Sequence, residues 1–287
     1  MPASPSQLIT RRLTEPVTFS GVGVHSGTDA FVRVGPAPLG AGITFHRTDL
    51  GRSIAASADR VAATTLATVL SQDGAEVRTV EHLMSAMAAL SVRDATIEIN
   101  TAELPIMDGS AKPFFELLSA AVADDAPADA YIVKQPVWVS RKEAYAAFIP
   151  APRRQFDLTI DFADQAIGIE RLIFDLDTDD YGTQIAPART FGRYRDIHTM
   201  RRKGFGRGAS LDNAIAVDGA KVLNPEGLRF PDEFVRHKLL DTIGDLALAG
   251  KPIIGLFRSH KGGHRLNYEL LRTFLSNTDA WELTHAS

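Results

Sequence analysis

The 287-residue chain carries 31 Lys and Arg residues against 35 Asp and Glu residues, giving a formal net charge of −4, and 45% of its residues are hydrophobic. These values are ordinary for a globular protein with a buried core, and the acidic balance argues against a nucleic-acid partner. The chain has no cysteine, which excludes disulfides and thiolate metal sites and leaves only nitrogen and oxygen ligands for any metal.

The N-terminal segment, MPASPSQLITRRLTEP (residues 1–16), lacks the apolar core of a signal peptide. Nowhere does the sequence contain the roughly 20 apolar residues that a membrane-spanning helix needs. We therefore expect a cytoplasmic protein with no integral membrane segment.

The first half of the chain is predicted to begin with strands and to continue with helices. Apolar or β-branched runs between Gly- and Pro-bearing turns predict strands at Val17–Val24, Ala30–Val34, Gly42–His46 and Ala63–Leu70. Leu and Met residues recur at helical spacing over Val80–Leu90, which predicts a helix capped by Thr79. A strand and a helix are expected next, at Ala95–Ile99 and Lys112–Val122.

The segment Ala123–Ala130 consists of small and acidic residues without bulky apolar groups. Such a composition is typical of a linker. We therefore predict two domains, covering residues 5–126 and 131–287.

The second half is predicted to repeat this order of strands and helices, although no repeat is visible at the level of residues. Strands are expected at Tyr131–Val139, Ala144–Ile149, Phe156–Phe162, Glu170–Phe174 and Ile253–Phe257. Helices are expected at Tyr194–Arg202, Asp232–Ala249 and His264–Leu275. The Asp218-Gly219 pair predicts a hairpin between Ala214–Val217 and Lys221–Leu223. Strands followed by helices, twice, favour an α+β fold.

Two short segments carry the residue types of a metal site. His237 and Asp241 are four residues apart and share one face of a helix, while Glu81-His82 adds a second imidazole beside a carboxylate. Two His and one Asp suit a catalytic zinc that keeps a position for water, and Glu81 can then accept the proton of that water. Each segment alone is also explained by a solvated helix face, and the sequence lacks a His-Glu-x-x-His motif.

Two loops offer further candidates. Ser259–His264 is either an ordinary Gly-rich connection or a loop that lets His264 protonate a leaving group beside Lys261. Ala188–Gly192 either starts a helix capped by Thr190 or directs the hydroxyl of Thr190 at a developing oxyanion. The absence of a Gly-x-Ser-x-Gly motif argues against a serine hydrolase.

Six blocks, in chain order, closely resemble the UDP-3-O-acyl-N-acetylglucosamine deacetylase family, the zinc enzymes of lipid A biosynthesis in Gram-negative bacteria. They are GVGVHSG (21–27), RTVEHLMSAMAAL (78–90), PIMDGSAKPF (105–114), ARTFG (188–192), LNPEGLRFPDEFVRHKLLDTIGDL (223–246) and HKGGHRLN (260–267). The resemblance extends from Arg11 to Asn277, nearly the whole chain.

The resemblance implies a role for each matching residue. One zinc ion per chain would be held by His82, His237 and Asp241. The general base would be Glu81, the general acid His264, its orienting carboxylate Asp245, and the hydroxyl at the oxyanion Thr190. Substrate-binding positions would be Phe162, Phe191, Lys238 and Lys261.

The resemblance also implies the fold. We expect two similar two-layer domains, each with a sheet packed against a helix pair, that enclose the helices between the two sheets. A small β-α-β insert in the second domain, at about residues 192–222, would form an apolar passage for a fatty acyl chain. Its lining would include Tyr194, Ile197 and Leu211.

The implied reaction is removal of acetate from the 2-acetamido group of UDP-3-O-acyl-N-acetylglucosamine by a zinc-bound water, the committed step of lipid A biosynthesis. The partner would be this UDP-linked acylated amino sugar, and the protein would be a monomer. Two alternatives remain open at this point. One is a zinc amidase that acts on another N-acyl substrate, and the other is a module whose structural metal is closed by a fourth ligand. Two His and one Asp do not separate zinc from ferrous iron.

Overall fold

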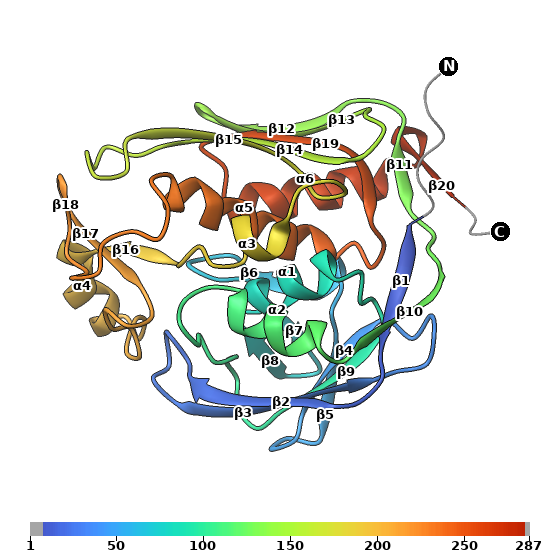
Figure 1. The fold of residues 1–287 in the computed structure, drawn as a ribbon, viewed down its shortest axis with the longest axis horizontal. Coiled ribbons are helices and arrows are strands. Elements are labelled where there is room, and N and C mark those ends of the chain that lie inside the picture. The colour runs from blue at the N-terminus through green and yellow to red at the C-terminus, as the bar shows by residue number, and fades with distance from the viewer. Residues whose placement is uncertain (1–7, 285–287) are drawn as a thin grey trace.

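The structure, a computed structural model, describes residues 8–284 (Figure 1). Two large sheets form the outer layers and most of the helices lie between them, so the predicted α+β fold is confirmed. The helices are α1 (Glu81–Ala89), α2 (Lys112–Ser119), α3 (Tyr181–Gln184), α4 (Ile197–Arg202), α5 (Glu233–Ala247) and α6 (His264–Ser276). Short 3₁₀ turns are η1 (Ala58–Arg60), η2 (Tyr194–Asp196) and η3 (Thr278–Ala280).

The sheet of the first half has five strands. Their order is β2 (Val17–Val22), β3 (Asp29–Pro36), β9 (Ala95–Ile99), β4 (Ile43–Arg47) and β5 (Arg52–Ala55). In β3, Ala30, Val32 and Val34 are buried, and the residues between them face outward. This alternation is what a half-buried strand requires, and it turns the apolar face of the sheet toward the helices.

The sheet of the second half has seven strands. Five of them follow the order β12 (Val137–Arg141), β13 (Ala144–Ile149), β19 (Ile253–His260), β11 (Tyr131–Val133) and β20 (Trp281–Leu283). The other two are β14 (Arg154–Asp161), which pairs in parallel with β19, and β15 (Ile169–Asp175), which pairs with β14. The apolar core is continuous from one sheet through the helices to the other.

Smaller sheets complete the fold. One joins β1 (Ile9–Leu13) to β10 (Val122–Pro127), and another contains β6 (Val61–Ala63), β7 (Val69–Gln72) and β8 (Ala75–Arg78). The third contains β16 (Phe191–Arg193), β17 (Ile215–Asp218) and β18 (Lys221–Val222). Because β16 and β17 are parallel and α4 lies between them in the chain, this region has the predicted β-α-β form.

Several predicted elements are wrong in detail. The proposed linker Ala123–Ala130 lies largely in β10, whose backbone pairs with β1. The run Ala63–Leu70 is interrupted by a loop, because Leu66 has a φ of 66° and no strand includes residues 64–68. Thr79 does not cap α1: its φ is 59° and its hydroxyl donates to Glu103 Oε1 at 3.1 Å.

Other boundaries shift by several residues. The strand expected at Tyr131–Val139 is two strands, β11 and β12, in different places in the sheet. The helix expected at Lys112–Val122 ends at Ser119, and the one expected at Tyr194–Arg202 begins with the η2 turn. Thr190 starts no helix, since it directly precedes β16. The two-domain division remains a prediction, and its outer limits, residues 5 and 287, lie outside the described residues.

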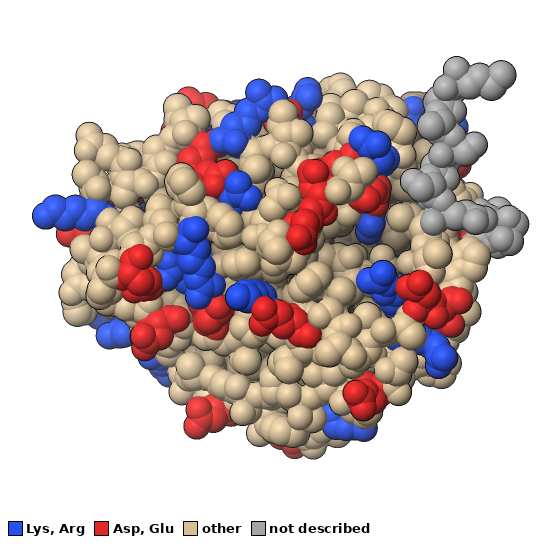
Figure 2. All heavy atoms as spheres, viewed as in Figure 1, with Lys and Arg blue, Asp and Glu red and all other residues tan. Residues whose placement is uncertain are grey.

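Both ends of the described chain are attached to the same connecting segment. The Ala128 amide donates to the carbonyl of Leu8 at 2.7 Å, and the Ala130 amide donates to Thr284 Oγ1 at 2.8 Å. On the face shown in Figure 2, basic and acidic side chains are interspersed. Within residues 8–284, no helix is both long and apolar enough to cross a membrane.

Candidate metal centre and active site

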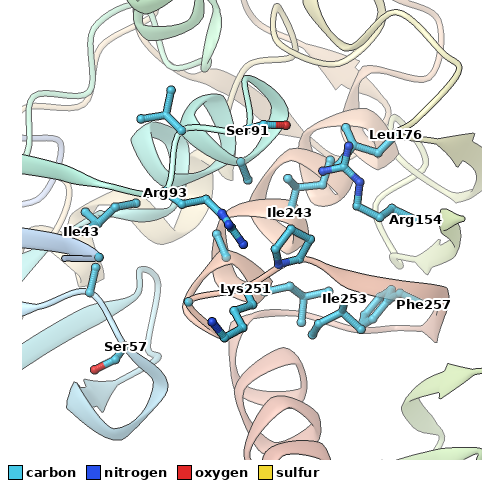
Figure 3. A pocket seen from close by; sticks show the side chains of 18 of the residues that line it. Ile43, Ser57, Ser91, Arg93, Arg154, Leu176, Ile243, Lys251, Ile253 and Phe257 are labelled. Atoms are coloured by element: carbon cyan, nitrogen blue, oxygen red, sulfur yellow. The ribbon is translucent and has the colours of Figure 1, made fainter. Parts of the chain in front are cut away.

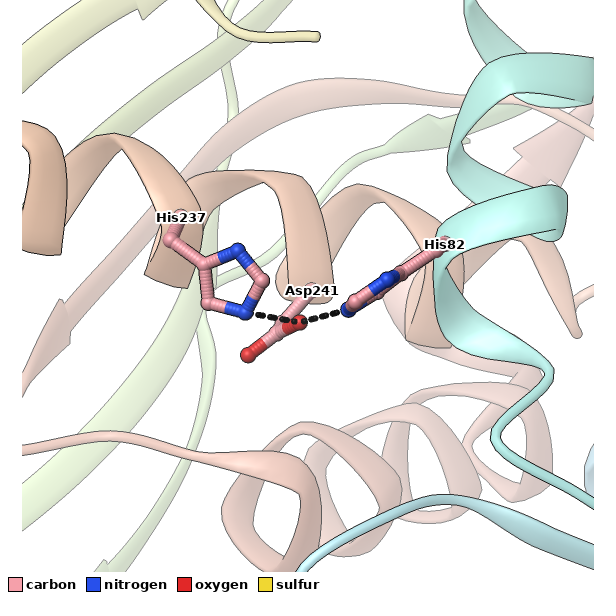
Figure 4. Close-up of side chains that lie close together, drawn as sticks. All are labelled: His82, His237 and Asp241. Atoms are coloured by element: carbon pink, nitrogen blue, oxygen red, sulfur yellow. Dashed lines mark ion pairs between the residues drawn. The ribbon is translucent and has the colours of Figure 1, made fainter. Parts of the chain in front are cut away.

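Helices α1 and α5 pack side by side and position the candidate ligands (Figure 4). Glu81 and His82 lie in the first turn of α1, and His237 and Asp241 lie one turn apart on α5. The close packing requires a glycine at position 244, because a Cβ there would collide with the backbone of Glu81. Sequence segments about 155 residues apart (237 minus 82) therefore meet at one point.

The three predicted ligands converge. Atoms of His82, His237 and Asp241 lie within 4.8 Å of one another, and all three residues are buried. Asp241 Oδ1 is 3.5 Å from His82 Nε2 and 3.2 Å from His237 Nε2 (Figure 4). This group could hold a metal ion.

The protonation of His237 shows that the group suits a cation. Its Nδ1 faces the carbonyl of Ala188 at 3.1 Å, and a carbonyl only accepts, so Nδ1 carries the proton. Burial lowers the pKa of His237 to about 3, so the ring is neutral and Nε2 presents a lone pair to Asp241 Oδ1. That buried oxygen has no hydrogen-bond partner among the described residues. Two facing acceptors of this kind are satisfied by a divalent cation between them.

Glu81 is placed beside this group. Its carboxylate accepts a hydrogen bond from the Thr68 amide at 3.1 Å, and its other oxygen lies 3.7 Å from His264 Nε2. Burial raises the pKa of Glu81, against the opposing charge of His264. A carboxylate with a raised pKa is the better proton acceptor near neutral pH.

His264 is charged and held in place. Its Nδ1 donates to Asp245 Oδ2 at 2.8 Å. Burial lowers the pKa of His264, but the carboxylate of Asp245, together with those of Glu81 and Asp241, outweighs burial and raises the pKa to about 9. Thr68 Oγ1 donates to Asp245 at 2.6 Å and Asn267 Nδ2 donates at 2.9 Å, which fixes the carboxylate in turn. The pKa values of Glu81 and His264 are thus both raised, by burial in Glu81 and by neighbouring carboxylates in His264.

Neither Thr68 nor Asn267 was assigned a role from the sequence, although Asn267 ends the HKGGHRLN block. Thr68 lies in a run that the sequence presents as a strand, and its contact with Asp245 spans 177 residues. Asn267 belongs to the apparently ordinary helix α6. Thr68 and Asn267 come to support the Asp245 carboxylate only because the residue 64–68 loop and α6 pack against α5.

A cavity of 440 Å³, here called the site cavity, opens from this group toward the β-α-β region. Its lining includes eleven of the fourteen predicted site residues: Glu81, His82, Thr190, Phe191, Tyr194, Ile197, Leu211, His237, Lys238, Asp241 and His264. Lys238 Nζ donates to Asp241 Oδ2 at 2.8 Å and lies 5.6 Å from the centre of the Phe191 ring. The cavity therefore joins a charged end to an apolar branch.

The other three predicted residues lie outside that lining. Asp245 lies behind His264, and Phe162 packs against Phe191 with 5.6 Å between the ring centres. Lys261 Nζ contacts Asp161 at 2.9 Å and Glu143 at 3.0 Å. Lys261 is therefore already neutralised by two carboxylates.

His25 and Leu66 are among the lining residues that were missed from the sequence. The loop of His25 is held by Glu103, which accepts from the amides of His25 at 2.8 Å and Ser26 at 2.7 Å. The GVGVHSG block contained the signal for His25, although no role was assigned to it. Leu66 lies in the loop that replaces the predicted strand, so no sequence pattern indicated it.

Comparisons with known proteins agree over nearly the whole chain. Residues 10–276 match the family model described as UDP-3-O-acyl N-acetylglycosamine deacetylase. A Myxococcus xanthus protein named UDP-3-O-acyl-N-acetylglucosamine deacetylase is 44% identical over 286 residues, covering 98% of this chain and 91% of the relative. Proteins of the same name from Hahella chejuensis and Shewanella loihica are 43% and 42% identical, covering 95% and 96% of this chain and 92% of each relative.

Proposed function

Because the chain belongs to the UDP-3-O-acyl N-acetylglycosamine deacetylase family, we propose that it removes acetate from the 2-acetamido group of UDP-3-O-acyl-N-acetylglucosamine. This reaction would commit the amino sugar to lipid A biosynthesis. The observation that supports the proposal best is the buried group of His82, His237 and Asp241, with Glu81 and His264 beside it at the end of one cavity.

We propose that the ion is zinc, one per chain, held by His82, His237 and Asp241. When bound, the ion would supply Lewis-acid polarisation of a water and of the acetamide carbonyl. Neutral His237 and ionised Asp241 are in the protonation states that metal ligands need. The chain has no thiolate to compete with them, since it contains no cysteine.

The proton transfers fall to two side chains. Glu81 would take a proton from the attacking water, and His264 would give one to the departing amine nitrogen. Asp245 keeps His264 charged, so the proton is available at neutral pH. The products would be acetate and a UDP-linked glucosamine that keeps its 3-O-acyl chain.

Substrate binding would divide along the site cavity. Thr190, half-buried in the lining, would donate its hydroxyl proton to the oxyanion. The acyl chain would lie against Tyr194, Ile197 and Leu211, where apolar surface is removed from water. Lys238 would meet polar oxygens of the sugar.

The nucleotide would lie near Phe162 and Lys261. To contact a phosphate, Lys261 would exchange Asp161 or Glu143 for it. Such an exchange keeps the ammonium paired throughout, so its cost is small.

The test is direct. The purified protein, loaded with zinc, is incubated with UDP-3-O-acyl-N-acetylglucosamine and separately with N-acetyl peptides, and released acetate is measured. We expect turnover of the UDP-sugar alone. Turnover of the peptides without turnover of the UDP-sugar would show that the protein is a different amidase. Acetate release by a Glu81→Ala variant at the wild-type rate would show that Glu81 is not the general base.

A further inference from the structure

A second cavity lies at the opposite end of the α1–α5 helix pair (Figure 3). It measures 250 Å³. Ala88 and Ser91 reach it from the end of α1 and the turn after it, and Ile243 and Leu246 reach it from the last turns of α5. The site cavity is lined instead by the first turn of α1 and the middle of α5, and no described residue lines both cavities.

The interior of the second cavity is mainly apolar. Ile43 comes from the five-stranded sheet, and Phe148, Phe156 and Phe257 come from the seven-stranded sheet. The volume far exceeds the roughly 10–15 Å³ that one water needs, and an apolar cavity of this kind favours an apolar guest. The shape and lining therefore suit a hydrocarbon chain.

The charged lining of the second cavity has one sign. Arg93 and Arg154 enter from opposite sides, with Lys251 nearby (Figure 3), and no carboxylate side chain is part of the lining formed by the described residues. Arg154 is neutralised, because its Nε donates to Asp177 at 2.6 Å. The two remaining cations lie near the same residue, Asp129.

Arg93 and Lys251 are less completely paired than Arg154. Lys251 Nζ is 3.6 Å from Asp129 Oδ2, which is longer than a hydrogen bond. Arg93 donates through Nη1 to the backbone carbonyl of Asp129 at 2.7 Å, but its Nε is buried and has no hydrogen-bond partner in the described part of the chain. The carboxylates of Asp94 and Asp129 also attract Arg93 electrostatically, but neither accepts a hydrogen bond from its Nε, and Asp94 accepts from the Gly42 amide at 2.7 Å. A buried guanidinium N–H without an acceptor costs free energy, which an incoming anion would recover.

We propose that the second cavity binds a free fatty acid. Its alkyl chain would lie among Ile243, Leu246 and the phenylalanines of the seven-stranded sheet, and its carboxylate would meet Arg93 and Lys251. A carboxylate matches the planar donor pattern of a guanidinium, and a single chain suits a cavity smaller than the site cavity. Because the lining comes from both large sheets, the bound molecule would stabilise their packing against the helix pair.

Calorimetric titration with dodecanoate, below its micelle concentration, tests this proposal. The site cavity can also accept an alkyl chain, so we expect two classes of site on the wild-type protein. Arg93→Gln should weaken one class roughly tenfold or more, the usual effect of removing a charged hydrogen bond. Arg33→Gln, a change at an exposed arginine paired with Glu98, is the matched control and should leave both classes unchanged.

A crystal structure with a bromine-labelled dodecanoate locates each class directly. Bromine density between Ile243 and Phe257 supports the proposal, and density confined to the site cavity overturns it. If dodecanol binds as tightly as dodecanoate, or if the Arg93→Gln variant binds dodecanoate with unchanged affinity, then Arg93 and Lys251 do not recognise the carboxylate. Either result would overturn the proposal. Lys251→Met provides a second charge removal if Arg93→Gln fails to fold. Deacetylation should be unchanged in both variants, because neither residue lines the site cavity.

Discussion

The two ends of the α1–α5 pair are built by the same helices but differ in chemistry. At one end, His82, His237 and Asp241 meet within 4.8 Å, with Glu81 and His264 beside them. At the other end, small and apolar residues leave a cavity whose charged lining residues, within residues 8–284, are all cations. Each end thus leaves a buried polar atom without a hydrogen-bond partner among the described residues, the acceptor Asp241 Oδ1 at one and the donor Arg93 Nε at the other, so the first suits a cation and the second an anion.

The largest effect should follow from His237→Ala at the polar end. We expect metal content to fall from one ion per chain to nearly none and deacetylation to be lost, because the remaining two ligands bind weakly. Metal analysis after gel filtration measures this. Arg93→Gln at the apolar end should keep its full metal content, and retained metal in His237→Ala would break the comparison.

Glu81→Ala separates catalysis from metal binding within the polar end. We expect turnover to fall by about two to four decades, the usual contribution of a general base, while the metal stays bound. Initial rates together with metal analysis check both parts. A variant that loses the metal as well would place Glu81 among the ligands instead.

Asp245→Asn tests the pairing that raises the pKa of His264 to about 9. Without this carboxylate, the pKa of His264 should fall, because burial lowers it and the charges of Glu81 and Asp241 alone oppose burial less strongly, so fewer molecules are protonated at pH 8. Because a general acid acts when protonated, the alkaline limb of the kcat–pH profile should move to lower pH. An unchanged limb would exclude His264 as the acid.

Gly244→Ala changes a residue at the contact between α1 and α5 and should disturb the packing of these two helices. The added methyl group would collide with the backbone of Glu81, so we expect unfolding to become easier by about 1–3 kcal/mol. Chemical denaturation measures the loss. Gly192→Ala, where a Cβ meets nothing within 4 Å, is the control. Equal stability of the two variants would mean that the helices can separate without cost.

Glu170→Gln lies outside both ends and should have the smallest effect. Burial raises the pKa of Glu170 to about 7, and its Oε2 accepts from the Val235 amide at 2.9 Å. A raised carboxyl pKa gives stability that is present below pH 4.5 and lost as the pH rises through 7. The glutamine variant should therefore match the wild type at about pH 4 and exceed it by about 1 kcal/mol at pH 8, after allowance for partial exposure. Denaturation at both pH values checks the sign.

Elements with strong local patterns were predicted closely. The strands Ala95–Ile99 and Ala144–Ile149 are confirmed to the residue, and the helix expected at Asp232–Ala249 is α5, Glu233–Ala247. Alternation and helical periodicity depend on neighbouring residues, so the sequence displays them. By contrast, β10 contains Asp124 and Asp125, which are not typical strand residues. It forms because its backbone pairs with β1, more than 100 residues earlier in the chain.

The candidate site was predictable in a similarly uneven way. Helical spacing grouped His237 with Asp241, and residue type made His82 and His264 candidates on other elements, but only the family resemblance favoured these roles over the ordinary explanations of each segment. Their proximity in the structure agrees with that grouping, and their catalytic roles remain proposals. Thr68 and Asn267 could not be found, because their contacts with Asp245 exist only after α6 and the residue 64–68 loop pack against α5.

The attachment of Leu8 and Thr284 to the segment 128–130 has a practical consequence for protein engineering. Since both backbone positions are anchored side by side, a short peptide could join them and new ends could be opened elsewhere, as in circular permutation. The exposed hairpin at Asp218-Gly219 is a suitable place to cut, because it is held by few backbone bonds. Such a rearranged polypeptide would carry α5 ahead of α1 in translation order, while the same side chains would form the candidate metal site.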